Sequence, residues 1–147
     1  MSTEIVTVTH YADHPSIDVD SWADHELGRR HNIFGSNNPN NQNLKPGDMS
    51  VVVAYSRVRK NWIVQLVRIE ERLYICTLWE DNGGRSWKYN YRFTPLSNPF
   101  IVSKDNKNDE FIRLCKKYDL EWHACLNSRI HGFRNRFLPV LKHFTFN

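Results

Sequence analysis

The first hundred residues carry several short segments whose hydrophobic and polar positions suit β-strands. Residues 4–10 alternate and are rich in β-branched side chains, which predicts a strand. Residues 49–55 contain the unbroken apolar run Val51 to Ala54, typical of a strand buried on both faces. Two further strands are predicted at 62–69 and 73–78. Strands at roughly ten-residue spacing with short polar turns indicate a small barrel or sandwich rather than alternating β-α units.

Helical patterns occur early and late in the chain. Ser21 is a candidate N-cap for a short amphipathic helix over residues 22–31, although a glycine inside this segment weakens the pattern. An acidic first turn starts a helix over 109–118, and a second helical region covers 121–136. Residues 34–43 are polar and turn-prone, so we expect a long loop there.

The segment 78–96 combines aromatic rings and cations around a Gly-Gly turn, as in a hairpin or a loop. Alternation along its second arm turns Tyr91 and Phe93 toward the interior, and it favours the same place for Tyr89, which counts against Tyr89 as a binding ring. Arg92, which lies between two of them, faces outward. The rings left free to stack on a flat ligand are then Trp79 and Trp87.

Length and charge limit the possible classes of protein. The chain has 147 residues, which fits one domain that can bury a core without disulfides or metals. Its formal charge is +4, and residues 111–147 hold seven Lys or Arg against two Asp or Glu. The basic excess therefore belongs to the C-terminal segment, where it allows an anionic partner without requiring one. The alternative is an amphipathic helix whose basic side is only solvated.

Cysteine usage and hydropathy point to the interior of the cell. The three cysteines are widely spaced and form no disulfide framework, and residues 1–4 lack the pattern of a secretion signal. No apolar run approaches the roughly 20 residues needed to cross a bilayer. We therefore expect a soluble intracellular protein, cytoplasmic or nuclear, without a membrane partner.

Candidate metal ligands and catalytic motifs are weak. Cys115, His123, Cys125 and His131 fit no usual zinc spacing, so we expect no metal and no cofactor. The chain has no nucleophile elbow, no phosphate-binding glycine loop and no carboxylate pair with evident acid-base geometry. These observations favour a binding protein over an enzyme.

Several sequence features occur in one order along residues 4–103. After the first strand and helix come an aromatic-glycine pair, a turn before the apolar strand, and two aromatic segments: Phe34-Gly35, Lys45-Pro46-Gly47-Asp48, Leu78-Trp79 and Tyr89-Asn90-Tyr91-Arg92-Phe93. In this order and spacing the chain resembles the EVE domain, a member of the PUA-like superfamily related to YTH and ASCH domains. Phe34 stands where the family usually has Trp, and Asn90 where it usually has Pro or His.

The resemblance implies both a fold and a function. The implied fold is α+β: a small PUA-like β-barrel of five or six strands with helices at its edges over residues 1–105. Residues 106–147 would form a helical C-terminal extension packed on the same domain. In the EVE and YTH group a concave pocket takes a flipped, chemically modified base from a nucleic acid, so the implied partner is DNA or RNA carrying such a base.

The physical requirements of this function select candidate residues. A flipped base needs flat apolar walls, hydrogen-bonding groups at its edge and positive charge for the flanking phosphates. We expect a methylated base between the 34–38 loop and the 79–89 loop. The predicted pocket residues are His10, Tyr11, Phe34, Gly35, Ser36, Asn37, Asn38, Trp79, Trp87 and Tyr89. The predicted phosphate contacts are Arg57, Arg59, Lys60, Arg85 and Arg92.

Each assignment has a structural alternative. One of the two free tryptophans could close a barrel end. Arg92 could pair with Glu80 or Asp81, Trp62 is expected in the core, and residues 40–43 are expected to form a solvated loop.

Two other functions remain open. One is an ASCH-like amidohydrolase acting on a modified nucleoside through Lys45 with Glu70 or Glu71. The other is an adaptor that joins a larger protein complex through its C-terminal helices.

Overall fold

The computed structural model describes residues 5–11, 21–56, 58–83, 86–123 and 134–146. The strands are β1 (Ile5–Tyr11), β2 (Ile33–Ser36), β3 (Met49–Ser56), β4 (Asn61–Leu73), β5 (Tyr89–Pro95) and β6 (Phe100–Val102). The helices are α1 (Ser21–His31), α2 (Leu78–Asp81), α3 (Glu110–Lys117) and α5 (Leu138–Lys142), with 3-10 turns η1 (Pro39–Asn41) and η2 (Arg134–Phe137).

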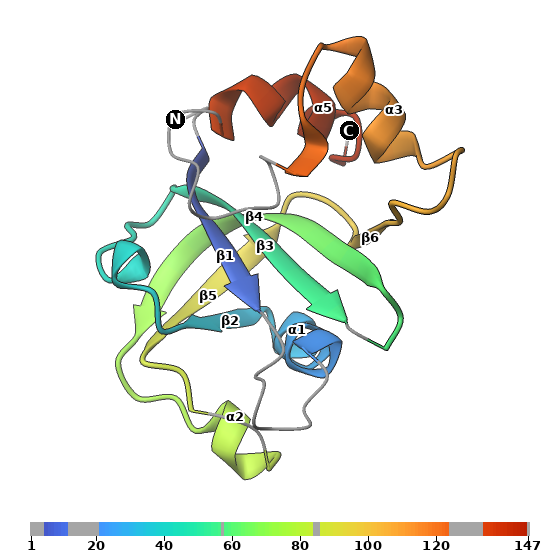
Figure 1. The fold of residues 1–147 in the computed structure, drawn as a ribbon. Helices are drawn as coiled ribbons and strands as arrows, with labels where there is room; N and C mark the ends of the chain where they lie inside the picture. The colour runs from blue at the N-terminus through green and yellow to red at the C-terminus, as the bar shows by residue number, and fades with distance from the viewer. Residues whose placement is uncertain (1–4, 12–20, 57, 84–85, 124–133, 147) are drawn as a thin grey trace.

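The strands form one curled sheet in the order β1-β3-β4-β5-β2, and β6 pairs with β4 (Figure 1). β1 and β3 are parallel, whereas the other pairs are antiparallel. The edge strands β1 and β2 come into contact, although they are not neighbours in the hydrogen-bonded order. The fold is therefore α+β, with a half-barrel sheet and a few helices.

Most predicted elements are confirmed. The strands expected at 4–10, 49–55 and 62–69 correspond to β1, β3 and β4, and the helices expected at 22–31 and 109–118 correspond to α1 and α3. α3 begins where the Asp109 side chain accepts a hydrogen bond from the backbone N–H of Ile112, at 3.0 Å. The same carboxylate accepts from the N–H of Ser103, at 2.7 Å, so it also fixes the chain entering the helix.

Three expected elements differ from the structure. The 34–43 loop begins with strand β2, which pairs with β5. The strand expected at 73–78 is wrong, because β4 ends at Leu73 and α2 begins at Leu78; one arm of the aromatic segment is thus a helical turn. Residues 124–133 of the helical region expected at 121–136 lie outside the described residues.

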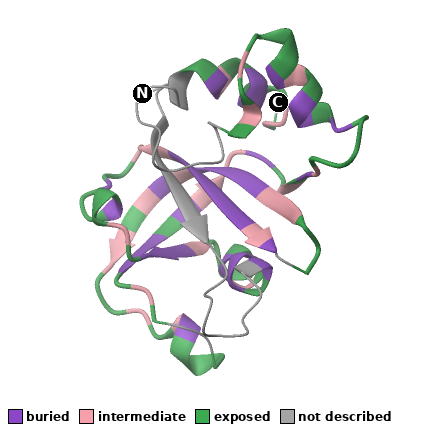
Figure 2. Ribbon diagram, viewed as in Figure 1, coloured by how far each residue is buried: buried purple, intermediate pink, exposed green. Residues whose placement is uncertain are grey.

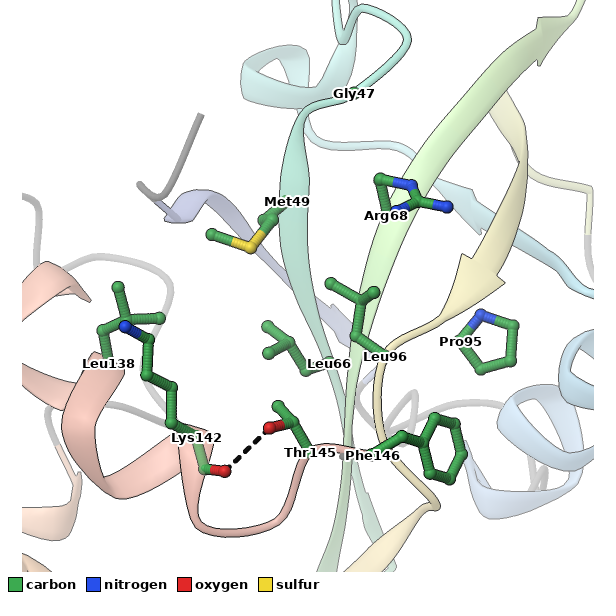
Figure 3. A pocket seen from close by; sticks show the side chains of 10 residues that line it. All are labelled: Gly47, Met49, Leu66, Arg68, Pro95, Leu96, Leu138, Lys142, Thr145 and Phe146. Atoms are coloured by element: carbon green, nitrogen blue, oxygen red, sulfur yellow. Dashed lines mark hydrogen bonds between the residues drawn. The ribbon is translucent and has the colours of Figure 1, made fainter. Parts of the chain in front are cut away.

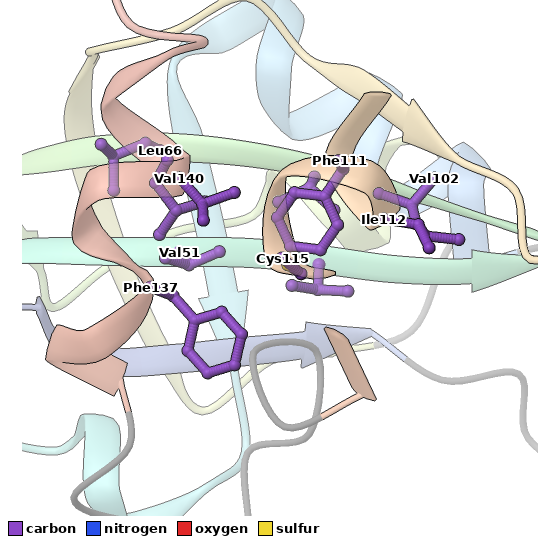
Figure 4. Packing of buried hydrophobic residues seen from close by; sticks show 11 residues of the cluster. Val51, Leu66, Val102, Phe111, Ile112, Cys115, Phe137 and Val140 are labelled. Atoms are coloured by element: carbon purple, nitrogen blue, oxygen red, sulfur yellow. The ribbon is translucent and has the colours of Figure 1, made fainter. Parts of the chain in front are cut away.

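One face of β3 and β4 is covered by α3 and α5, and we call this packing the outer core (Figure 4). Its buried members are Val51, Val53, Val64, Leu66, Val102, Phe111, Ile112, Cys115, Phe137, Val140 and Leu141. The segment expected as a C-terminal extension thus contributes helices that bury apolar surface directly against the strands. Figure 2 shows the same division, with buried positions along β3 and β4 and exposed positions on the outward sides of the helices.

The opposite face of the sheet forms an inner core with larger rings. Its buried members are Trp22, Phe34, Leu44, Val52, Ala54, Val67, Ile69, Tyr89, Tyr91 and Phe93. Phe34 comes from β2 and Val52 from β3, two strands far apart in the sheet order, so these side chains belong to one core only because the sheet curls around it. The predicted alternation along β5 is confirmed, because its three rings are buried while Arg92 is exposed.

Helix α1 closes one end of the half-barrel by a close approach at Gly28. A Cβ atom at Gly28 would lie 2.2 Å from the carbonyl oxygen of Ile33 and 2.9 Å from the Trp79 ring. The glycine that weakens the helix pattern is therefore needed, because only a residue without a side chain fits between these neighbours.

His25 of α1 is 3 % exposed and lies beside β3. Burial lowers its pKa from 6.5 to about 4, and the nearby positive charge of Arg29 acts in the same direction. A backbone hydrogen bond with Val52 opposes this shift without reversing it. His25 is therefore neutral at pH 7.

Among the described residues, none of the helices has the length and apolar character that spanning a membrane would require.

Candidate functional site

Three chain segments meet at one end of the sheet. β2 ends at Ser36, which lies opposite Tyr89 at the start of β5, and Leu73 at the end of β4 lies opposite Asn90. The pairing therefore places residues 36–38, 72–74 and 86–89 side by side. The two loops predicted to form the base pocket, 34–38 and 79–89, do approach one another at this end.

Trp87 is the ring that best fits a binding role at this sheet end. It is half-buried, and it packs so closely on Gly35 that a Cβ atom there would lie 2.5 Å from the Trp87 Cβ atom. The Nδ2 of Asn90 donates to the Trp87 carbonyl at 2.7 Å, and the N–H of Lys88 donates to Oδ1 of Asn37 at 2.8 Å. The predicted residues Gly35, Asn37 and Trp87 are thus brought together.

The polar residues after β2 stabilise their own loop. Ser36 is buried, and its hydroxyl oxygen accepts from the N–H of Asn38 at 3.1 Å and from Nδ2 of Asn41 at 2.7 Å. Asn41 is 1 % exposed, so the expectation of a fully solvated 40–43 loop is wrong at this position. Below it, the Tyr91 hydroxyl donates to the Asn41 carbonyl and accepts from the N–H of Leu44 at 3.2 Å.

Other predicted pocket rings are core residues in this structure. Phe34 is 1 % exposed, Tyr89 is 5 % exposed, and Trp79 is completely buried. The Trp79 Nε1–H donates to Oδ1 of Asn90 at 2.6 Å, and its ring lies edge-on to Trp87, with centroids 6.4 Å apart. None of the three offers an open face for stacking here, so Trp79 takes the alternative role of closing a barrel end.

His10 and Tyr11 lie at the end of β1, opposite Val53 and Ala54 of β3. Only their backbone placement is described. Their predicted contact with a base stays a prediction.

The predicted phosphate contacts are dispersed. Arg57 and Arg85 lie outside the described residues. Arg59 and Lys60 belong to the β3–β4 turn, at the opposite end of β4 from Leu73, and the Arg59 guanidinium lies 4.4 Å from the Trp22 ring centroid. Arg92 pairs with Glu71 at 2.9 Å rather than with Glu80 or Asp81.

Cations do lie on rings at the sheet end, but different ones from those predicted. The Arg72 guanidinium carbon is 4.6 Å from the Tyr74 ring centroid and 5.4 Å from that of Tyr89. Lys88 Nζ is 5.5 Å from the Tyr89 centroid. Cation-ring contacts of this length are attractive and hold the charges beside the rings. The pair Arg72 and Tyr74 was missed by sequence reasoning, although a basic and an aromatic residue at a strand end was a usable signal.

Trp62, expected in the core, is only half-buried but packs against the outer core. It forms an aromatic group with Tyr55, at 4.6 Å between centroids, and with Trp122, at 5.0 Å. These contacts hold the hairpin end of β3 and β4 to the segment after α3.

The structure offers no metal site among the described residues. Cys115 is buried, as its place on the apolar side of its helix predicts, and burial raises the pKa of its thiol to about 12, with Asp109 adding to the shift. Such a thiol is protonated at pH 7 and is a poor nucleophile or metal ligand. His123 stacks on Trp122 with centroids 3.6 Å apart.

The residues of the amidohydrolase alternative are partly brought together. Lys45 and Glu71 line one surface hollow of about 350 Å³, but Glu71 is held by Arg92. Glu70 accepts hydrogen bonds from the Thr94 hydroxyl at 2.6 Å and from Arg68 at 3.3 Å. The Thr94 bond in particular lowers the Glu70 pKa. Both carboxylates are thus already bonded to neighbouring groups.

A separate cavity of about 360 Å³ lies between α5 and the outer face of β3, β4 and the end of β5 (Figure 3). Met49 and Leu138 face each other across it, and most of its lining is apolar. It contains none of the predicted site residues, so it is unrelated to the sheet-end site.

Comparison of the chain with protein-family models, with curated proteins and with solved structures finds no match.

Proposed function

We propose that the protein is a nucleic-acid-binding module of the PUA-like, EVE type that recognises a modified base without catalysis. The observation that supports this proposal most directly is the surroundings of Trp87, a half-buried indole packed on Gly35. Lys88, which follows Trp87 in the chain, donates a backbone hydrogen bond to the Asn37 side chain. A flat ring, an exposed amide and a cation at one place are what a stacked, charged ligand requires.

In this proposal the base stacks on the exposed part of Trp87. Asn37 and Asn38 are exposed and half-buried, respectively, and they supply amide groups for the edge of the base. Lys88 is exposed. In this arrangement its charge faces the phosphates of the bound nucleic acid. A methyl group on the base would add apolar contact with the indole, which gives a physical reason for preferring a methylated base. Because Trp79 and Phe34 are core residues, Trp87 alone carries the stacking.

The test is binding of a fluorescent single-stranded oligonucleotide with one methylated base, compared with its unmodified counterpart. Trp87→Ala should weaken binding of the methylated strand by about 5- to 150-fold, because stacking on one ring contributes roughly 1–3 kcal/mol per base. Trp87→Phe should retain part of the preference. Tyr118→Ala is the matched control, since this ring is 47 % exposed on the surface near α3.

The proposal fails if a folded Trp87→Ala protein binds both strands as the wild type does. It also fails if the wild type does not distinguish them at any salt concentration. Circular dichroism of each variant separates loss of binding from loss of structure.

The amidohydrolase is the second candidate, because Lys45 and Glu71 line the same hollow. Its weakness is the ion pair between Glu71 and Arg92. Release of a small amine or acid from modified nucleosides by the wild type, abolished in Lys45→Ala, would replace the binding-only proposal.

A further inference from the structure

Tyr74 is an exposed ring held in a defined position. It follows directly after β4 and is 82 % exposed, although a tyrosine ring usually gains stability by burial. The Arg72 guanidinium lies 4.6 Å from its centroid. Arg72 is itself fixed, because its Nη1 donates to the Gln42 carbonyl at 2.9 Å. One side of the Tyr74 ring is therefore supported by a cation, while most of the ring stays open to solvent.

The surface beside this ring is hollow and carries positive charge. Tyr74 and Arg72 line a hollow of about 350 Å³ together with the loop that includes Lys45. Lys45 is exposed, and among the described residues no carboxylate pairs with its side chain. The carboxylate that lines the hollow, Glu71, is paired with Arg92. The charge available to a ligand is thus that of Lys45 and Arg72.

The hollow adjoins the site proposed for the modified base. Leu73 pairs with Asn90, so Tyr74 comes next to the start of β5, where Tyr89 contacts both Arg72 and Lys88. Trp87 lies just beyond, two residues before Tyr89. Paired strands are about 4.8 Å apart and consecutive Cα atoms about 3.8 Å apart, and Tyr74 and Trp87 come one and three residues beyond the Leu73–Asn90 pair, so they lie within the reach of one short stretch of nucleic acid.

We propose that Tyr74 stacks on a second, unmodified nucleotide of the same strand, whose phosphate is bound by Lys45 and Arg72. A flat base as ligand accounts for a tyrosine ring that is held in place yet exposed. The phosphate of the same nucleotide accounts for the two cations in the hollow. This inference rests on the proposed function, because it requires a nucleic-acid strand at Trp87. It makes the partner a single strand, since a base inside a duplex cannot stack on a side chain without leaving its pair.

The test compares Tyr74→Ala with Ile75→Ala, a neighbour that is 89 % exposed and has an aliphatic side chain. The probes are a ten-nucleotide single strand with one methylated base, its unmodified counterpart, and the free methylated nucleoside. Tyr74→Ala should weaken both strands equally by about 5- to 150-fold and leave the nucleoside unaffected. Ile75→Ala should bind all three probes as the wild type does. Tyr74→Phe should retain strand binding, because stacking does not need the hydroxyl.

Lys45→Gln addresses the phosphate contact. It should weaken both strands and reduce the slope of log affinity against log salt by about 1.

The outcomes separate this inference from the proposed function. If the wild type prefers the methylated strand but Tyr74→Ala leaves strand affinity unchanged, the second nucleotide site is wrong and the base site stands. If Tyr74→Ala abolishes the preference for the methylated base instead, the ring belongs to the base pocket and the inference is wrong. If no strand binds the wild type, both proposals fail.

Discussion

The two sides of the sheet are filled by different chemistry. In the outer core, the buried side chains from β3, β4, β6, α3 and α5 are hydrocarbon apart from the Cys115 thiol. In the inner core and its mouth, large rings lie beside buried groups that need directional partners, such as the Tyr91 hydroxyl, the Ser36 hydroxyl and the His25 imidazole. Hydrocarbon contacts are non-directional, whereas a buried hydroxyl or imidazole is costly unless its partners are in place.

The two cores therefore have different roles: the outer core mainly stabilises the fold, and the inner core fixes the positions of particular groups. The outer core holds the C-terminal helices mainly by burial of hydrocarbon, and its hydrogen bonds lie at its margins, such as those accepted by Asp109 at the start of α3. The inner core fixes the loop after β2 through hydrogen bonds to Tyr91 and Ser36. The proposed binding surface stands on this second, directional framework, which keeps Asn37 and Trp87 in place.

The largest effect should come from the outer core. Phe111→Ala removes a ring that is 1 % exposed and packs near Phe100 and Phe144. We expect a loss of about 3–5 kcal/mol in the free energy of unfolding, with no dependence on pH. Urea denaturation measures it, and Phe146→Ala, at a ring that is 53 % exposed, serves as the control with a change within about 0.5 kcal/mol. A loss below 1 kcal/mol for Phe111→Ala would contradict the assignment of this face as a tightly packed core.

The next largest effect should be a pH dependence of the free energy of unfolding, caused by the buried His25 on the inner side of the sheet. His25 has a folded-state pKa of about 4, against 6.5 for the ordinary group. Between these values the unfolded chain binds a proton that the folded chain does not, so stability is complete above pH 6.5 and falls as the pH drops toward 4. The expected loss is on the order of 3 kcal/mol.

Two measurements check the His25 prediction. Urea midpoints should fall between pH 7 and pH 4 and depend less on pH in His25→Gln. Imidazole proton resonances should show one histidine that titrates near 4. If every histidine resonance of the folded protein titrates near 6.5, the buried neutral state of His25 is wrong.

The smallest change in the free energy of unfolding should come from removing the Tyr91 hydroxyl group. Tyr91→Phe keeps the ring but leaves the N–H of Leu44 and the carbonyl of Asn41 without this partner. We expect a loss of about 1–3 kcal/mol, because unsatisfied buried groups are expensive. Tyr118→Phe, at an exposed ring, is the matched control and should change stability by less than about 0.5 kcal/mol. Equal effects at both positions would show that the inner core does not depend on this hydroxyl.

The sequence pattern predicted those strands and helices whose formation depends on residues close together in the chain. The apolar run in β3, the alternation along β5 and the acidic start of α3 each depend on residues adjacent in sequence. β2 was missed because its four residues form a strand only through pairing with β5, more than fifty positions later. Nothing in its own polar, glycine-containing neighbourhood signals a strand.

The candidate site was predicted in part for the same reason. The order of motifs indicated that the 34–38 and 79–89 loops belong together, and Gly35, Asn37 and Trp87 do meet. The burial of Trp79 could not be foreseen, because it depends on the close approach at Gly28 in a different helix. Arg72 and Tyr74 could not be assigned to the site from the sequence, because their position depends on the pairing of the end of β4 with the start of β5.

The parallel pairing of β1 with β3 has a consequence for how the chain assembles during synthesis. Residues 10 and 53 lie opposite one another, so the partner of β1 is made long after β1 itself. At about 5–20 residues per second, β1 waits roughly 2–9 s before β3 is available. β3 and β4, by contrast, are joined by a short turn and can pair as soon as both have emerged. β2 waits longer still, because Ser36 pairs with Tyr89, so the two edge strands β1 and β2 are each synthesised well before the strand that holds them in the sheet.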